Sequence, residues 1–158
     1  MIVVADSSPL ILLSRVGVLD AFATAFREVV VPDAVWREVV EARPDARGVS
    51  ALRAAPWLRV DARELPAIDM GLDPGETAAI TLAEVLHADL LLIDERAGRV
   101  VAERRGLLVR GTLGVLVQLR ETGALTALKP VVDALAAEGF RVSPVLIAEV
   151  LGRVGELP

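Results

Sequence analysis

Residues 89–106 read DLLLIDERAGRVVAERRG. Within this stretch, residues 90–93 form a continuous apolar run, which is typical of a strand buried on both faces of a parallel sheet. Asp94 ends the run, and the following residues keep helical spacing up to Gly106, a residue type that often ends helices. Because ligands bind at the carboxyl ends of strands in open parallel sheets, we expect Asp94 at the floor of a crevice. The alternative is that Asp94 only caps the next helix.

The same pattern occurs at the beginning of the chain, where an apolar run at residues 2–5 is followed by Asp6 and a helix-start signal. Strands are also predicted at residues 28–31, 57–60 and 107–109, with a short edge strand at 140–142. Helices are predicted at residues 10–15, 19–26, 32–42, 47–55, 73–87, 113–121, 130–138 and 144–153, and a loop at 63–71. The alternation predicts an α/β fold, a three-layer α/β/α sandwich with a central, mainly parallel sheet, in a single domain spanning residues 1–158.

Composition excludes several classes of protein. The chain has no Cys and a single His, so disulfides, Cys-ligated zinc and His-rich metal sites are excluded. His87 is expected to cap the end of a helix. The net charge of −5 excludes a strongly basic nucleic-acid binder, although residues 96–110 hold five Arg against one Glu. The N-terminus is unlike a signal peptide, and no uncharged run approaches the ~18 residues of a membrane span, so a cytoplasmic location is expected.

Four acidic residues occupy distinctive positions. Asp6 and Asp94 each follow a buried strand, Glu76 lies in the first turn of a helix, and Glu38 lies on the polar side of another. If the two strands are neighbours, Asp6 and Asp94 stand side by side, and clustered carboxylates must share a proton or a cation. Without His or Cys, such a cluster suits Mg²⁺ or Mn²⁺, which generate hydroxide and stabilise charge on phosphoryl oxygens.

Each of these acids also has a structural explanation. Glu76 completes a capping box that begins at Asp73, Asp6 is a credible N-cap, and Glu38 alone suits a solvated helix face. Spacing in the sequence does not bring the four side chains into contact. The sequence therefore leaves both interpretations of each acid open.

Five segments in this order resemble the PIN-domain superfamily, most closely its short prokaryotic PIN-like proteins of unassigned function. They are VVADSSPL (3–10), VPDAVWREV (31–39), DPGETAA (73–79), LLIDER (91–96) and RGTLG (110–114). The resemblance implies an α/β/α fold with a parallel sheet. It also implies a divalent-metal-dependent ribonuclease that hydrolyses RNA phosphodiesters with Mg²⁺ or Mn²⁺, often as the toxin of a toxin–antitoxin pair. RNA and a small antitoxin protein are the partners it implies.

The resemblance also assigns roles to individual residues. Asp6, Glu38, Glu76 and Asp94 match the acidic quartet that binds metal and catalyses, with Ser7, Glu95 and Thr112 as auxiliary residues. The chain departs from the pattern twice: Leu92 stands where typical PIN toxins carry Thr or Ser, and Glu76 stands where many carry Asp. The longer acid changes the reach of the carboxylate toward a metal ion.

Two further expectations concern binding. Arg96 and Arg99 are expected to contact RNA phosphates, and the apolar circumference of the terminal helix at residues 144–154 predicts a homodimer. Two other classes of protein compete with the nuclease. One is a catalytically inactive PIN-like binding module. The other is a phospho-receiver domain, which generally needs paired acids after its first strand, whereas here Ser7 and Ser8 follow Asp6.

Overall fold

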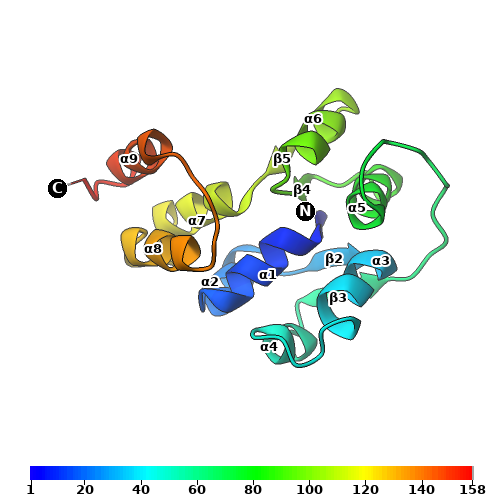
Figure 1. The fold of residues 1–158 in the computed structure, drawn as a ribbon, viewed down its shortest axis with the longest axis horizontal. Coiled ribbons are helices and arrows are strands. Elements are labelled where there is room, and N and C mark those ends of the chain that lie inside the picture. The colour runs from blue at the N-terminus through cyan, green and yellow to red at the C-terminus, as the bar shows by residue number, and fades with distance from the viewer. Residues whose placement is uncertain (158) are drawn as a thin grey trace.

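The computed structural model describes residues 1–157, and its centre is a parallel β-sheet (Figure 1). Five strands lie in the order β3-β2-β1-β4-β5, and every neighbouring pair is parallel. Their bounds are β1 Val3–Ala5, β2 Val29–Pro32, β3 Leu58–Asp61, β4 Leu90–Leu92 and β5 Val109–Arg110. The predicted α/β fold with a parallel central sheet is confirmed.

Helices connect the strands and complete the three-layer sandwich. One of them, α5, packs on β1, β2 and β4, whereas α1 packs against η1, α4 and α7. The helices are α1 Ser7–Arg15, α2 Leu19–Ala25, α3 Asp33–Trp36, η1 Arg37–Glu41, α4 Val49–Arg53, α5 Pro74–Val85, α6 Arg96–Arg104, α7 Thr112–Glu121, α8 Lys129–Ala137 and α9 Pro144–Arg153.

The strands are as deeply buried as their apolar sequences predict. Leu91, Leu92 and Ile93 have no exposed surface, and Val4 and Ala5 are equally buried. Burying an aliphatic side chain of this size contributes roughly 1.5–3 kcal/mol. Short strands therefore suffice here, because the helices on both faces cover them.

The strand order reverses direction between β1 and β4. The chain runs from β1 outward through β2 to β3, then returns to the other side of β1 with β4 and continues outward to β5. In open α/β sheets, such a switch point leaves a crevice at the carboxyl ends of the two central strands. Asp6 and Asp94 follow these two strands.

Three predicted elements differ from the structure. Residues 140–142 are not a strand: the Phe140 N–H bonds to the Leu135 carbonyl and closes α8, so this backbone group is not available to a sheet. The last strand is β5, Val109–Arg110, rather than residues 107–109, because the Leu107 N–H bonds to Ala102 at the end of α6. The helix at 32–42 changes from α to π winding at Arg37.

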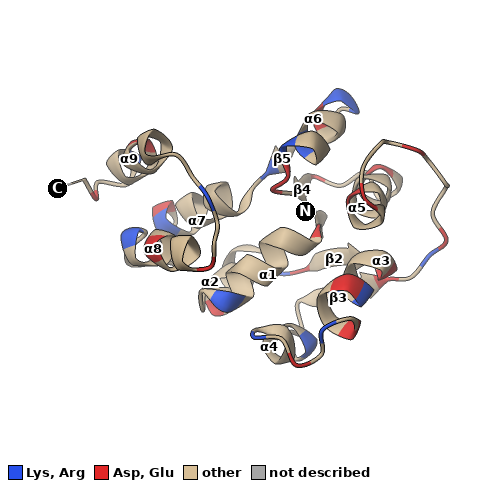
Figure 2. Cartoon of the chain, viewed as in Figure 1, with Lys and Arg blue, Asp and Glu red and all other residues tan. Residues whose placement is uncertain are grey.

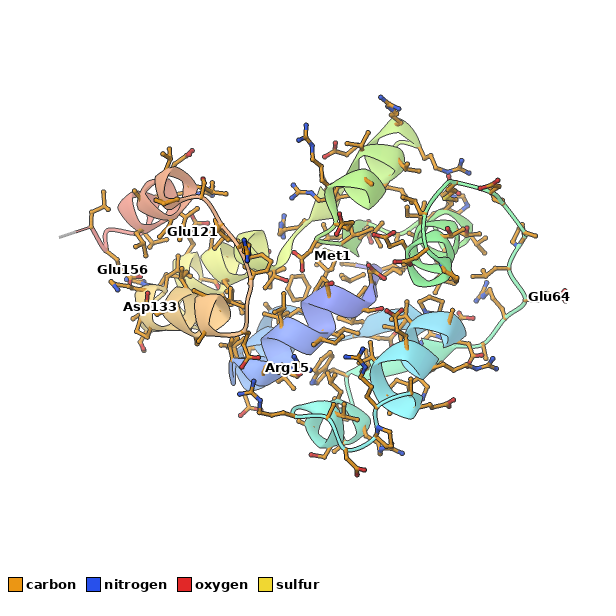
Figure 3. The ribbon with its side chains drawn as sticks, viewed as in Figure 1. Met1, Arg15, Glu64, Glu121, Asp133 and Glu156 are labelled. Atoms are coloured by element: carbon orange, nitrogen blue, oxygen red, sulfur yellow. The ribbon has the colours of Figure 1, made fainter. Side chains whose placement is uncertain are left out.

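The C-terminal helices α7, α8 and α9 lie together at one end of the molecule (Figure 1). Glu156, labelled in Figure 3, accepts hydrogen bonds from the Leu128 and Lys129 N–H groups and from Arg120 Nε. These donors, the Leu128 N–H foremost, hold the pKa of the Glu156 carboxyl below its ordinary value. The terminal segment is therefore tied to the start of α8. Within residues 1–157, no helix combines the length and the apolar character needed to cross a membrane.

Candidate functional site

Asp6 lies at the carboxyl end of β1 and is almost fully buried. Its N–H donates to the Leu92 carbonyl at 2.9 Å, and only 5% of the residue is exposed. It occupies the N-cap position of α1, but its side chain makes no capping hydrogen bond, so capping does not explain it. Burial raises the pKa of Asp6 from 3.8 to about 7, with further increases from Glu76, Asp73 and Glu38 and an opposing effect of the Ser7 N–H.

Glu38 lies on the exposed side of η1 and reaches back toward α1. Ser7 Oγ donates a hydrogen bond to Glu38 Oε2 at 2.8 Å. The wider π turn is closed by the Ala42 N–H bonding to the Arg37 carbonyl five residues earlier. Such turns are frequent at functional sites because they displace side chains from regular helical positions.

Glu76 fills two roles at the start of α5. It completes the predicted capping box: its N–H donates to Asp73 Oδ1 at 2.8 Å, and the Asp73 N–H donates to Glu76 Oε2 at 3.4 Å. The residue is also only 6% exposed. Burial, followed by the charge of Asp73, raises the pKa of Glu76. The capping explanation is thus confirmed, and the same carboxylate still faces the charge of Asp6.

Asp94 is held by the start of α7. The Thr112 N–H donates to Asp94 Oδ1 and Thr112 Oγ1 donates to Asp94 Oδ2, both at 2.6 Å. Burial raises the pKa of Asp94, whereas the two Thr112 hydrogen bonds and the Arg99 charge lower it. Thr112 itself is completely buried. Thr112 therefore lies against Asp94, and its auxiliary role stays a prediction.

The register between β1 and β4 separates Asp6 from Asp94. Ala5 pairs with Leu92, so Asp6 continues opposite Ile93, and Asp94 lies one residue further along the chain. The neighbouring carboxylates that raise the pKa of Asp6 are Glu76, Asp73 and Glu38. The charges of Glu38 and Glu76 thus act on Asp6, whereas Asp94 is held by Thr112 and is not among the charges that raise the pKa of Asp6.

Asp73 is an acid that the sequence analysis treated only as a helix cap. Its charge raises the pKa of both Asp6 and Glu76. The sequence already indicated that Asp73 lies close to Glu76, because the first residue of a capping box bonds to the backbone of the fourth. What the sequence did not show was that Asp6 lies beside this turn.

The carboxylates of the site form no ion pair in the described part of the chain, and the one cation whose charge lowers the pKa of any of them is Arg99, beside Asp94. Among the ion pairs within residues 1–157, none includes Asp6, Glu38, Glu76 or Asp94. Figure 2 shows acidic residues at the start of α1 and after β4. Buried carboxylates in this situation favour a proton or a hard cation, so the donor set suits Mg²⁺ or Mn²⁺. In the described part of the chain, however, no group of three or more His, Asp or Glu side chains is already arranged closely enough to hold a metal ion.

A cavity of about 870 Å³ extends from Asp94 and Arg99 along β5 toward α9. Its lining includes the apolar residues Leu113, Val142, Leu146 and Val150 and the basic residues Arg99, Arg110, Arg141 and Arg153. The charge of Arg153 is already matched, because its Nε donates to Glu121 Oε1 at 2.6 Å. Arg110 donates to the neutral amide oxygen of Gln118 and keeps its charge unmatched among the ion pairs within residues 1–157. Of the two predicted phosphate-contacting residues, Arg99 lines the cavity, whereas Arg96 and the auxiliary acid Glu95 are exposed at the start of α6.

The fold and the site define an α/β/α protein with carboxylates gathered at the switch point of a parallel sheet. A sequence profile of the PIN-domain family matches residues 2–156, and the chain therefore belongs to the PIN-domain family. This family has a nuclease-type fold and generally uses divalent metal ions.

A solved structure shares the fold at low sequence identity. It is a PilT N-terminus domain protein, SSO1118, from the hyperthermophilic archaeon Sulfolobus solfataricus P2, with a TM-score of 0.55 and 17% sequence identity. The likeness covers 75% of this chain and 93% of the archaeal chain. A search of curated proteins gave no match.

Proposed function

We propose that this protein is a divalent-metal-dependent ribonuclease that hydrolyses RNA phosphodiesters. The observation that supports this proposal best is the set of carboxylates at the switch point, which form no ion pair within residues 1–157, in a chain of the PIN-domain family. Asp6, Glu38, Glu76 and Asp94 would hold the ion, Mg²⁺ or Mn²⁺. When bound, the ion lowers the pKa of water and stabilises charge on the phosphoryl oxygens.

The chain's own residues prepare this site in distinct ways. Ser7 restrains the Glu38 carboxylate, and Thr112 restrains both oxygens of Asp94. Asp6, whose pKa is about 7, carries a proton part of the time at neutral pH and gives it up when a cation arrives. Metal affinity should therefore increase with pH through this range.

A catalytically inactive PIN-like binding module is the second candidate. It is favoured by one observation: within residues 1–157, no three acidic side chains are yet arranged as a metal site. The phospho-receiver alternative is set aside, because the chain belongs to the PIN-domain family.

RNA cleavage decides between the nuclease and the inactive module. The purified protein is incubated with labelled RNA and Mn²⁺, and we expect cleavage that EDTA abolishes and that Asp94→Asn greatly reduces. The Asn variant also controls for a contaminating nuclease, because a contaminant would be unaffected by the substitution. Cleavage that persists in EDTA or in the variant contradicts the proposal, and binding of RNA without cleavage supports the inactive module.

Arg99 is expected to contribute to RNA binding. It lines the cavity together with Asp94, and its charge acts on that carboxylate, which supports a contact between its guanidinium and an RNA phosphate near the proposed site. Arg99→Gln should weaken RNA binding at low salt and reduce the slope of log affinity against log salt by about 1. Arg53→Gln is the matched control, because Arg53 lies in α4 and does not line this cavity. If the slope of log affinity against log salt is the same for the parent and for Arg99→Gln, Arg99 is a solvated surface residue that does not contact RNA phosphates.

A homodimer is also proposed. In α9 only Leu151 is buried, whereas Val145 is 77% and Leu146 41% exposed, and Leu108 beside β5 is 63% exposed. Leu108 and Leu146 line the same cavity, Val145 precedes Leu146 in α9, and exposed apolar side chains of this size suit an interface. Light scattering at micromolar concentration should give twice the monomer mass, and Val145→Arg should lower it to a folded monomer. Leu151→Arg is a poor probe, since it disturbs the monomer's own core. A monomeric parent contradicts the proposal.

The toxin role and the small antitoxin partner are proposals that rest on the family alone. A toxic ribonuclease should arrest growth when its synthesis is induced, and Asp94→Asn should remove the arrest. The cytoplasmic location expected from the sequence stays a prediction.

A further inference from the structure

Gly75 lies where α5 comes closest to Glu38. A Cβ atom built on Gly75 would lie 2.6 Å from Glu38 Oε2, 3.5 Å from Asp73 Oδ1 and 3.7 Å from Ser7 Oγ. At 2.6 Å the two atoms would overlap, so a side chain at position 75 forces the Glu38 carboxylate to move. Gly75 is the second residue of a regular helix and is not among the glycines with positive φ. The site therefore needs glycine here for space rather than for backbone conformation.

Glu38 is confined between two segments that are distant from it in sequence. On one side, Ser7 Oγ holds its Oε2 atom by a hydrogen bond of 2.8 Å. On the other side, the bare Cα of Gly75 lets the backbone of α5 approach the same oxygen. Glu38 lies on the exposed side of η1, so nothing in its own helix keeps the carboxylate turned toward Asp6.

We propose that Gly75 is a positioning residue: the missing side chain leaves the space in which the Glu38 carboxylate rests against Ser7 and faces Asp6. A methyl group at this position displaces Glu38 Oε2, and the flexible Glu38 side chain then swings outward. The fold accommodates this change, because Ala is a better helix former than Gly. The role of Gly75 toward a metal ion rests on the proposed metal-dependent function, whereas its contact with Glu38 does not.

The first test needs no metal. A crystal structure of Gly75→Ala is expected to show α5 unchanged and the hydrogen bond between Ser7 and Glu38 broken. Gly114→Ala is the matched control: Gly114 also lies in the first turn of a helix, but its Cβ would meet only the flexible Arg110 side chain. A Gly75→Ala structure that keeps the Ser7–Glu38 hydrogen bond at its parental length overturns the inference.

The second test is a double-mutant cycle read by Mn²⁺ calorimetry. We expect Gly75→Ala to weaken Mn²⁺ binding about 10-fold, the lower end of the effect of residues that orient metal ligands. In a Glu38→Ala background the same substitution should cause no further loss, because it acts through Glu38. Losses that simply add, or an unchanged affinity for Gly75→Ala, overturn the positioning role. A parent protein that binds no Mn²⁺ counts against the proposed function, and the crystal structure then decides the inference by itself.

Discussion

The metal-free protein is expected to lose stability as the pH rises from about 4 to about 7, and Asp6→Asn is expected to remove most of this loss. Burial raises the pKa of Asp6 from 3.8 to about 7 in the folded chain. Between these values the folded state binds more protons than the unfolded state, so the free energy of unfolding falls with increasing pH. At one pKa unit per 1.36 kcal/mol, the penalty reaches up to about 4 kcal/mol above pH 7. The raised pKa values of Glu76 and Asp94 act in the same direction.

Urea unfolding at a series of pH values in EDTA checks this prediction. The parent should show a falling midpoint between pH 4 and 7, whereas Asp6→Asn should be more stable at pH 8 and should lose much less stability across this range, with a residual fall that comes from Glu76 and Asp94.

Asp61→Asn is a control for which the expected change in the free energy of unfolding has the opposite sign. Hydrogen bonds from Arg63 lower the pKa of Asp61, so its charge stabilises the fold above the ordinary carboxyl pKa and this contribution is lost as the pH falls. Asp61→Asn should therefore destabilise the protein at neutral pH. If Asp6→Asn is no more stable than the parent at pH 8, the charged form of Asp6 does not destabilise the folded protein, and the prediction is wrong.

Asp94→Asn is expected to weaken Mn²⁺ binding at least about tenfold. Mutating a residue that only orients a metal ligand already costs about this much affinity, and a ligand itself should cost no less. The metal-free fold should survive, because the Asn carbonyl still accepts from the Thr112 N–H and its amide can donate to Thr112 Oγ1. The substitution thus removes charge while keeping the local hydrogen bonds. Calorimetry measures the affinity, and circular dichroism checks that the fold is retained.

Glu95→Gln is the matched control for Asp94→Asn. Glu95 is the next residue, is exposed at the start of α6, and loses the same charge in the same conservative way. We expect its effect on Mn²⁺ affinity to be much smaller, which agrees with an auxiliary role. Equal Mn²⁺ affinity in Asp94→Asn and the parent would remove Asp94 from the proposed ligands.

Local sequence patterns identified the elements that carry the site. The apolar runs before Asp6 and Asp94 predicted the two central strands, because only strands covered on both faces are apolar throughout. The Asp73–Glu76 capping box was predicted and is present, since its hydrogen bonds span only four residues. Short-range chemistry of this kind needs no knowledge of distant neighbours. Residues 140–142 show the limit of such patterns, since the alternation of apolar and charged side chains in Phe-Arg-Val does not reveal whether a strand lies beside it.

By itself the sequence determined the two central strands, the Asp73–Glu76 capping box and the PIN-domain resemblance, because these depend on neighbours along the chain. Only the tertiary structure decided the arrangement of the site. The register of β1 and β4 places Asp6 opposite Ile93 rather than beside Asp94. The approach of α5 to η1 places Gly75 against Glu38 and brings the Asp73 charge to Asp6. These contacts join segments more than thirty residues apart, and burial and Coulomb interactions act through space, so packing alone fixes which carboxylates share a site.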